Sequence, residues 1–263
     1  MSLTNKNKLL DVAVEAAIAS SNVIMGALEN PKKVTLKGTT DLVTSVDRES
    51  EDLIKAIIKS SFPDHDFLAE ESGKDGRNSD FLWIIDPLDG TTNFVHSYPS
   101  FAVSIGLFYQ GNPTISVVLE MPHVKLYSAI VSEGAYCEGI KITCSSTSKL
   151  IQSLLTTGFG YEHGSLWEEN MKLFKHFTNI TQGVRRLGAA SIDICHVAEG
   201  KIDGFWEYDL HPWDTAAGIL IAKESGCTIS NIEGKPYDIN KDKSIVVTNP
   251  FINESFLNEV KSI

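Results

Sequence analysis

Residues 83–92 read Trp-Ile-Ile-Asp-Pro-Leu-Asp-Gly-Thr-Thr, an apolar run that ends in two closely spaced acids and a glycine. The run begins at Phe81 and predicts a central strand that is buried on both faces. Asp86 would then stand at the carboxyl end of this strand. Pro87 fixes φ and removes a backbone donor. Asp89 follows three residues after Asp86, so the backbone can curl until both carboxylates point at one place.

Two carboxylates held this close repel each other, and a divalent cation that binds both as anions removes the repulsion. Hard oxygen ligands of this kind favour Mg²⁺. Gly90-Thr91-Thr92 resembles the first turn of a helix, whose N–H groups could hold an anion near the backbone. The alternative interpretation is an ordinary Asp-rich turn with a helix cap. The spacing does not match a Ca²⁺-binding EF-hand loop.

Three further acidic segments favour a site over a simple turn. Glu70 follows a short strand over 67–69, and Asp214 lies in the first turn of a predicted helix. Asp41 and Asp47 flank Leu-Val-Thr-Ser-Val, and Asp47 opens another helix. Each acid alone is typical of a helix cap or a strand end. The presence of all four segments in this order is a far more specific indication of a site than any one of them alone.

The remaining pattern predicts two sheets layered with helices. Apolar spacing predicts helices over 4–29 and 47–60, with short strands over 33–36 and 42–44 between them. A polar loop over 72–80 precedes the buried strand, and a meander of strands over 101–109, 114–120 and 125–131 implies an antiparallel sheet. The second half alternates strands (153–157, 183–186, 204–207, 227–230, 244–248) with helices (165–178, 189–199, 212–225, 251–261). The Ser/Thr-rich stretch 143–148 predicts a boundary between residues 1–147 and residues 148–263, which together would form one compact catalytic unit.

Composition excludes several classes of protein. The 263 residues include 42% hydrophobic and 22% charged residues, as in an ordinary soluble globular protein. The net charge of −11 argues against a broad grip on nucleic acid but not against a small anionic substrate, because a bound divalent metal can invert the local field. The four cysteines form no C-x-x-C pair, and no apolar run approaches the ~18 residues of a membrane span. We expect a cytoplasmic protein without direct nucleic-acid or membrane partners.

The acidic segments resemble the signature segments of the inositol monophosphatase family, which belongs to the lithium-sensitive, Mg²⁺-dependent sugar-phosphatase superfamily. The matching segments are Asp41–Asp47, Glu70-Glu71-Ser72, Trp83–His96 and Trp213–Gly218. The resemblance spans about residues 5–260 and fits the bacterial branch. It implies a mixed α/β (α+β) fold, a layered α-β-α-β-α sandwich with an antiparallel N-terminal sheet and a smaller C-terminal sheet flanked by helices. Residues 1–147 would carry most metal ligands, and residues 148–263 would carry Asp214 and the substrate pocket.

The resemblance also implies ligands for two to three Mg²⁺ ions. Glu70, Asp86 and the backbone carbonyl of Leu88 would hold the first ion, and Asp86, Asp89 and Asp214 the second. A third, weaker ion would share Glu70 with waters. We therefore expect inhibition by Li⁺ and by excess Mg²⁺.

The catalytic and substrate-binding roles follow from the same match. Thr91 and Asp47 would take the proton from the attacking water, and Glu70 would assist through its metal. The N–H groups of Gly90 and Thr91 would hold the phosphate. The substrate pocket would be lined by Asp89, Gly188, Ala189, Ala190, Glu207 and Asp214. A solvated strand-end carboxylate is the alternative interpretation of Glu207.

The resemblance implies hydrolysis of myo-inositol phosphate to inositol and phosphate. Animal members typically carry Thr where this chain has Ala189 and Ser near Gly160, so the alcohol half of the substrate stays open. The alternative substrates are fructose-1,6-bisphosphate, NADP, histidinol phosphate and 3′-phosphoadenosine 5′-phosphate. Relatives are mostly homodimers, and some act in transcription antitermination, so a homodimer and a transcription-machinery partner are further expectations.

Four side chains beside these motifs have more ordinary interpretations. Arg185 and Arg186 could reach a second phosphate, although a solvated or interface salt bridge is the simpler interpretation. His96 is predicted to pack beside the metal motif. Trp213, like Trp83, is predicted to be a core anchor.

Overall fold

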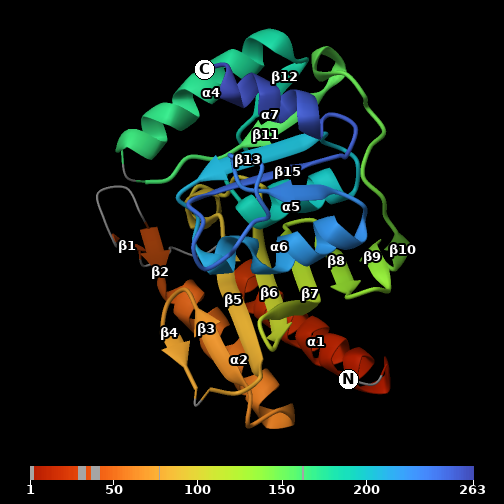
Figure 1. Ribbon diagram of the computed structural model, residues 1–263. Helices are drawn as coiled ribbons and strands as arrows, with labels where there is room; N and C mark the ends of the chain where they lie inside the picture. Colours follow the sequence, from red (N-terminus) through yellow and green to blue (C-terminus); the bar gives the residue numbers. More distant parts are fainter. Residues whose placement is uncertain (1–2, 29–33, 37–41, 77, 162) are drawn as a thin grey trace.

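The computed structural model describes residues 3–28, 34–36, 42–76, 78–161 and 163–263. Five layers of secondary structure lie on one another (Figure 1). The first layer is α1 (Leu3–Leu28) and α2 (Ser45–Ser61), followed by a large sheet. The middle layer holds α5 (Ala190–Ala198) and α6 (Pro212–Glu224), followed by a small sheet. The last layer is α4 (Ser165–Ile180) and α7 (Asn253–Lys261). This arrangement confirms the predicted α-β-α-β-α sandwich.

The large sheet has eight strands in the order β10-β9-β8-β7-β6-β5-β3-β4. They are β3 (Asp66–Ala69), β4 (Gly73–Asp75), β5 (Phe81–Asp89), β6 (Phe101–Tyr109), β7 (Asn112–Met121), β8 (Lys125–Ile130), β9 (Gly134–Cys137) and β10 (Ile140–Lys141). The predicted meander is confirmed because β5 to β10 pair antiparallel, whereas β3 pairs parallel with β5. Strands β4, β9 and β10 were not predicted. Strand β4 is Gly-Lys-Asp, has no apolar residue and lies in the stretch predicted to be a polar loop.

The small sheet has the order β12-β11-β13-β15-β14. Its strands are β11 (Leu154–Thr157), β12 (Gly183–Arg185), β13 (Gly204–Tyr208), β14 (Thr228–Ser230) and β15 (Ser244–Thr248), each within one or two residues of the prediction. The remaining elements are short: β1 (Val34–Leu36), which pairs with β2 (Leu42–Thr44), helix α3 (Thr91–Val95) and a 3₁₀ turn (Leu150–Gln152).

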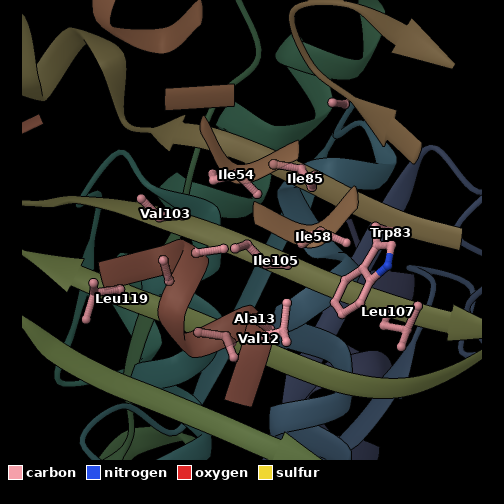
Figure 2. Close-up of a cluster of buried hydrophobic side chains, with 14 of the residues drawn as sticks. Val12, Ala13, Ile54, Ile58, Trp83, Ile85, Val103, Ile105, Leu107 and Leu119 are labelled. Carbon is pink, nitrogen blue, oxygen red and sulfur yellow. The ribbon is translucent and has the colours of Figure 1, made fainter. Parts of the chain in front are cut away.

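The described residues form four buried apolar clusters, and the three largest fill the spaces between the layers. The first lies between α1, α2 and the large sheet, where Ile54 and Ile58 face Trp83 and Ile105 (Figure 2). The second lies between the two sheets around α5 and α6, and the third lies under α4 and α7. Burial of apolar surface on this scale is the main favourable contribution to folding.

Helix α1 carries the one described segment that is long and apolar enough to cross a membrane, Lys6–Leu28. Its length and composition alone meet that criterion. Leu9, Val12 and Ala13 lie within the first apolar cluster and are at most 7% exposed. Of the apolar window in this segment, 44% is buried, as expected for a helix that packs one face on a sheet.

Helix α6 joins the two halves of the chain. It packs on β5, β6 and β7 of the large sheet and also contacts β14 of the small sheet. Gly106 permits this approach, because a Cβ there would lie 3.0 Å from the backbone of Ala216. The first turn of α6, which carries Asp214, is thereby held beside the end of β5.

Candidate active site

Strand β5 continues past Ile85, the predicted end, and its pairing with β6 is irregular between Asp86 and Asp89. Two bonds hold this irregular end: the Leu88 N–H donates to Asp86 Oδ1 at 3.0 Å, and Ser50 Oγ of α2 donates to the Pro87 carbonyl at 2.8 Å. Asp86 is 2% exposed and Asp89 is 8% exposed. The predicted curl is therefore present. Its Pro87 carbonyl is held by α2, which lies on the face of the sheet opposite α6.

Two further carboxylates face this turn. The Glu70 N–H donates to the Ile85 carbonyl at 3.2 Å, so the parallel pair β3 and β5 brings Glu70 to the same edge as Asp86. Asp214 lies in the first turn of α6, where its carboxylate accepts the His211 N–H at 2.6 Å. Burial raises the pKa of Asp86 well above its usual value, and the charges of Glu70, Asp89 and Asp214 raise it further.

This donor set fits a hard divalent cation. It consists of carboxylate oxygens and the Leu88 carbonyl, the ligands that Mg²⁺ prefers. Within the described residues, no group of three or more His, Cys, Asp or Glu side chains is positioned as it stands to hold a metal ion. A cation that drew these carboxylates together would neutralise the repulsion that raises the pKa of Asp86.

Asp89 is held by the N-terminus of α5. Its Oδ2 accepts the Ser191 N–H at 2.8 Å and the Ser191 hydroxyl at 2.6 Å. Burial is the main cause that raises the pKa of Asp89 to about 6, and the two bonds from Ser191 oppose it. The sequence analysis missed Ser191. A serine in the first turn of the helix predicted over 189–199 was the available signal, since serine is typical of helix starts.

Thr91 and Asp47 form a buried pair behind the turn. Thr91 Oγ1 lies 3.0 Å from Asp47 Oδ1 and 3.0 Å from the Leu88 carbonyl, so its single proton has two acceptors. The other oxygen of Asp47 accepts the N–H (2.9 Å) and the hydroxyl (2.6 Å) of Thr44, which caps α2. Burial raises the pKa of Asp47, and these hydrogen bonds oppose the rise. Asp47 therefore caps a helix and also contacts Thr91, two roles that the sequence analysis had treated as alternatives.

Gly90 lies where two loops approach each other. Its φ is +86°, and a Cβ there would lie 2.9 Å from the Ser100 carbonyl. Asn93 fixes the same contact, because its Nδ2 donates to the carbonyls of Ser100 (2.6 Å) and Leu187 (2.8 Å). Helix α3 is thus joined to the turn that leads into α5.

All but one of the predicted site residues line a single cavity of about 760 Å³. They are Glu70, Asp86, Leu88, Asp89, Gly90, Thr91, Gly188, Ala189, Ala190, Glu207 and Asp214. The exception, Asp47, is buried behind Thr91. Residues separated by more than 140 positions in the chain therefore share one cavity.

The part of the cavity around Glu207 is acidic and buried. Glu207 is 7% exposed, which excludes the solvated strand-end carboxylate. Burial raises its pKa well above the usual value, as do the charges of Asp193, Asp214 and Asp89, while Arg186 opposes the rise. Arg186 lines the cavity, whereas Arg185 is an exposed residue of β12. Asp193, which the sequence analysis missed, is buried in α5 and accepts the Thr156 hydroxyl at 2.8 Å.

Two predicted placements are wrong, and one lies outside the described residues. His96 is exposed at the end of α3 instead of packed beside the metal motif, because α3 has only five residues and ends there. Trp213 is half-buried, stacks on His211 with ring centroids 4.7 Å apart, and lines the cavity, unlike the fully buried Trp83. Asp41 falls outside the described residues.

The chain is similar to curated phosphatases along nearly its whole length. It is 46% identical to "Phosphatase IMPL1, chloroplastic" of Arabidopsis thaliana, over 96% of this chain and 70% of that protein. It is 44% identical to "Inositol-1-monophosphatase" of Synechocystis (93% and 86%). It is also 36% identical to "Nus factor SuhB" of Escherichia coli (95% and 94%).

Solved structures share the fold. An inositol monophosphatase from Anabaena has a TM-score of 0.86 at 37% identity, over 98% of this chain and 97% of that one. A staphylococcal inositol monophosphatase-1, described as a LiCl-soaked inhibitory complex, has a TM-score of 0.84 at 27% identity, over 98% and 95%. The model of the inositol monophosphatase family matches residues 5–263. The chain therefore belongs to the inositol monophosphatase family and is a phosphoric monoester hydrolase.

Proposed function

We propose that this protein is a Mg²⁺-dependent phosphatase that hydrolyses inositol monophosphate and related small polyol phosphates. The observation that carries the proposal is the convergence of Glu70, Asp89 and Asp214 on the buried Asp86 beside the Thr91–Asp47 pair. Such a group of acids suits metal-assisted hydrolysis of a phosphate dianion, because bound cations offset its charge.

Two to three Mg²⁺ ions would be held by residues already described. Glu70, Asp86 and the Leu88 carbonyl would hold the first ion, which is supported by the Glu70–Ile85 and Leu88–Asp86 bonds that fix this edge. Asp86, Asp89 and Asp214 would hold the second, and a third would share Glu70 with waters. When bound, the ions would neutralise the phosphate, activate water and stabilise the leaving oxygen.

The chain's own residues would orient and deprotonate the attacking water. Thr91 Oγ1 donates to Asp47, so its lone pairs are available to accept a proton from water in the cavity. The Thr91 proton would pass to Asp47, whose pKa is raised by burial and which therefore retains a proton more readily than an exposed aspartate. The backbone N–H groups of Gly90 and Thr91 would hold the phosphate oxygens.

The alcohol half of the substrate would lie between α5 and β13. Glu207 would accept a hydroxyl of the substrate, and Gly188, Ala189 and Ala190 would line the same pocket, as they line the cavity. Ala189 supplies no hydroxyl. We therefore include the other candidate substrates in the test: fructose-1,6-bisphosphate, NADP, histidinol phosphate and 3′-phosphoadenosine 5′-phosphate.

Phosphate release from this panel, with Mg²⁺, with chelator and with added Li⁺, tests the proposal. We expect the highest kcat/KM for inositol monophosphate, no turnover without the divalent cation and inhibition by millimolar Li⁺. Asp89→Asn and Asp214→Asn should abolish turnover while circular dichroism stays unchanged. Near-wild-type turnover of either variant at saturating Mg²⁺ would contradict the assigned ligands, and a preference for another substrate would contradict the assigned alcohol.

A second candidate function rests on the similarity to the E. coli protein named Nus factor SuhB. A transcription factor or RNA polymerase would then be a partner of this chain. Pull-down with purified polymerase separates the two functions, because a binding role should persist in Asp89→Asn whereas phosphatase activity should not. Loss of binding together with activity would contradict an independent role.

We further propose a cytoplasmic homodimer in which residues 1–147 and 148–263 form one catalytic unit. The packing of α6 against strands of both sheets supports the single unit. Light scattering of the purified chain tests the dimer. Separate expression of the two segments tests the unit, since neither should fold cooperatively alone. A monomer in solution would contradict the dimer. A half that folds cooperatively alone would contradict the single catalytic unit.

A further inference from the structure

Two of the four cysteines, neither of which lines the catalytic cavity, lie in segments that contact each other. Cys144 lies in the segment that crosses from β10 to the 3₁₀ turn before β11, and Cys227 lies between the end of α6 and β14. The Cys144 N–H donates to the Ser225 carbonyl at 3.1 Å, which holds the crossing segment against the end of α6. The Cys144 sulfur would lie 3.8 Å from a Cβ placed on Gly226, the residue directly before Cys227, so the two cysteines are neighbours in the fold.

The pair is accessible, whereas the other two cysteines are not. Cys144 and Cys227 are half-buried, and Gly226 between Ser225 and Cys227 is exposed. Cys137 and Cys195 are buried in the second apolar cluster. A small thiol-reactive molecule can therefore reach the first pair and not the second.

The two accessible thiols differ in pKa. The interaction with Cys227 is the main cause that lowers the pKa of Cys144 to about 7, whereas the interaction with Cys144 and burial raise the pKa of Cys227. Burial also raises the pKa of Cys137 and of Cys195. The thiolate is the nucleophile in thiol chemistry, so Cys144 is the attacking sulfur.

We propose that Cys144 and Cys227 form a thiol–disulfide exchange site whose reaction partner is a small disulfide of the glutathione type. The Cys144 thiolate attacks one sulfur of that disulfide, which forms a mixed disulfide and releases one thiolate. Cys227 then loses its proton to solvent, and its sulfur attacks Cys144, which forms the Cys144–Cys227 bond and releases the second thiolate. The protein dithiol is oxidised by two electrons, and the small disulfide is reduced to two thiols.

The bond would join the crossing segment to the end of the helix whose first turn carries Asp214. It would close a loop that contains all of α4, α5 and α6. A cross-link over a long loop restricts the unfolded chain, so the oxidised protein should unfold at a higher temperature than the reduced protein.

Mass spectrometry after incubation of the full chain with oxidised glutathione tests the proposal. We expect the loss of two alkylatable thiols, no retained glutathione, a Cys144–Cys227 peptide in a non-reducing digest, and a higher melting temperature that dithiothreitol reverses. The Cys227→Ser variant should retain one glutathione on Cys144. In the wild type, the first step at Cys144 should be roughly threefold faster at pH 7 than the same reaction of a cysteine of ordinary pKa. The matched control, Cys137→Ser, should behave as the wild type.

Three outcomes would overturn the proposal. They are a wild-type protein that keeps all four thiols alkylatable, a wild-type protein that retains glutathione on Cys144, and oxidation of Cys137 or Cys195 at the same rate. The first two need no variant, so misfolding of Cys227→Ser would not obscure them.

Discussion

Replacing Ser191 by alanine removes one of the two bonds by which α5 holds Asp89. The hydroxyl lies 2.6 Å from Asp89 Oδ2, and the N–H of the same residue lies 2.8 Å from it. Removal of a side chain that orients a metal-ligating residue typically weakens metal binding about 10- to 100-fold. Because the backbone bond stays, we expect the lower part of that range, roughly 10- to 30-fold weaker Mg²⁺ binding.

Calorimetric titration of the purified variant with Mg²⁺ measures this effect without turnover. The concentration of Mg²⁺ at half-maximal phosphatase rate should rise by a similar factor, while kcat at saturating Mg²⁺ changes little. Ser153→Ala is the matched control, because Ser153 is also fully buried but donates to the Leu150 carbonyl away from the cavity. Wild-type Mg²⁺ affinity in Ser191→Ala, or equal weakening in Ser153→Ala, would refute the reasoning.

Three further predictions concern other parts of the molecule. Asp47→Asn should lower kcat by about 10²–10⁴-fold with little change in KM, because the group that accepts the proton of Thr91 is lost. Steady-state kinetics measures both constants, and a change in KM alone would contradict the prediction. Gly90→Ala should lower the free energy of unfolding by about 1–3 kcal/mol, because φ is +86° and the new Cβ would meet the Ser100 carbonyl. Urea unfolding measures this loss, and an unchanged midpoint would contradict the prediction. Burial alone would raise the pKa of Glu199, but hydrogen bonds from lysine and tyrosine side chains outweigh it and lower that pKa to about 2. Glu199→Gln should therefore lower the free energy of unfolding by about 1–2 kcal/mol at pH 7, because a partly exposed ion pair contributes less than a buried one. This loss should become smaller as the pH falls from about 4.5 towards 2, where Glu199 of the wild type becomes protonated. Urea unfolding at pH 7 and pH 3 measures the loss, and an equal loss at both pH values would count against the prediction.

Most helices and strands follow from local pattern. The apolar run at Phe81–Ile85 predicted a buried strand, and the periodicity over 4–29 predicted α1. Strand β4 escaped prediction because Gly73, Lys74 and Asp75 give no apolar pattern, so its formation depends on pairing with β3. The end of β5 was placed too early because its pairing with β6 resumes at Asp89 after an irregularity, and that pairing depends on a neighbouring strand.

The chemistry of the site was present in the order of its residues. Asp86 and Asp89 stand three residues apart, so their proximity is a local property of one turn. Glu70 and Asp214 could be assigned to the same site only through a family resemblance, since nothing local joins them to Asp86. Their convergence depends on the parallel pairing of β3 with β5 and on the packing of α6 over Gly106.

Only the tertiary structure determined how the carboxylates are supported. Ser191 holds Asp89 across 102 residues, and Thr91 contacts Asp47 across 44. Such bonds form because layers of helix and sheet bury both partners in one place, and a buried polar group requires a partner. Residue order could therefore indicate which side chains are candidates for the chemistry. The folded layers decided which of them are buried, which are held, and which, like His96, face solvent.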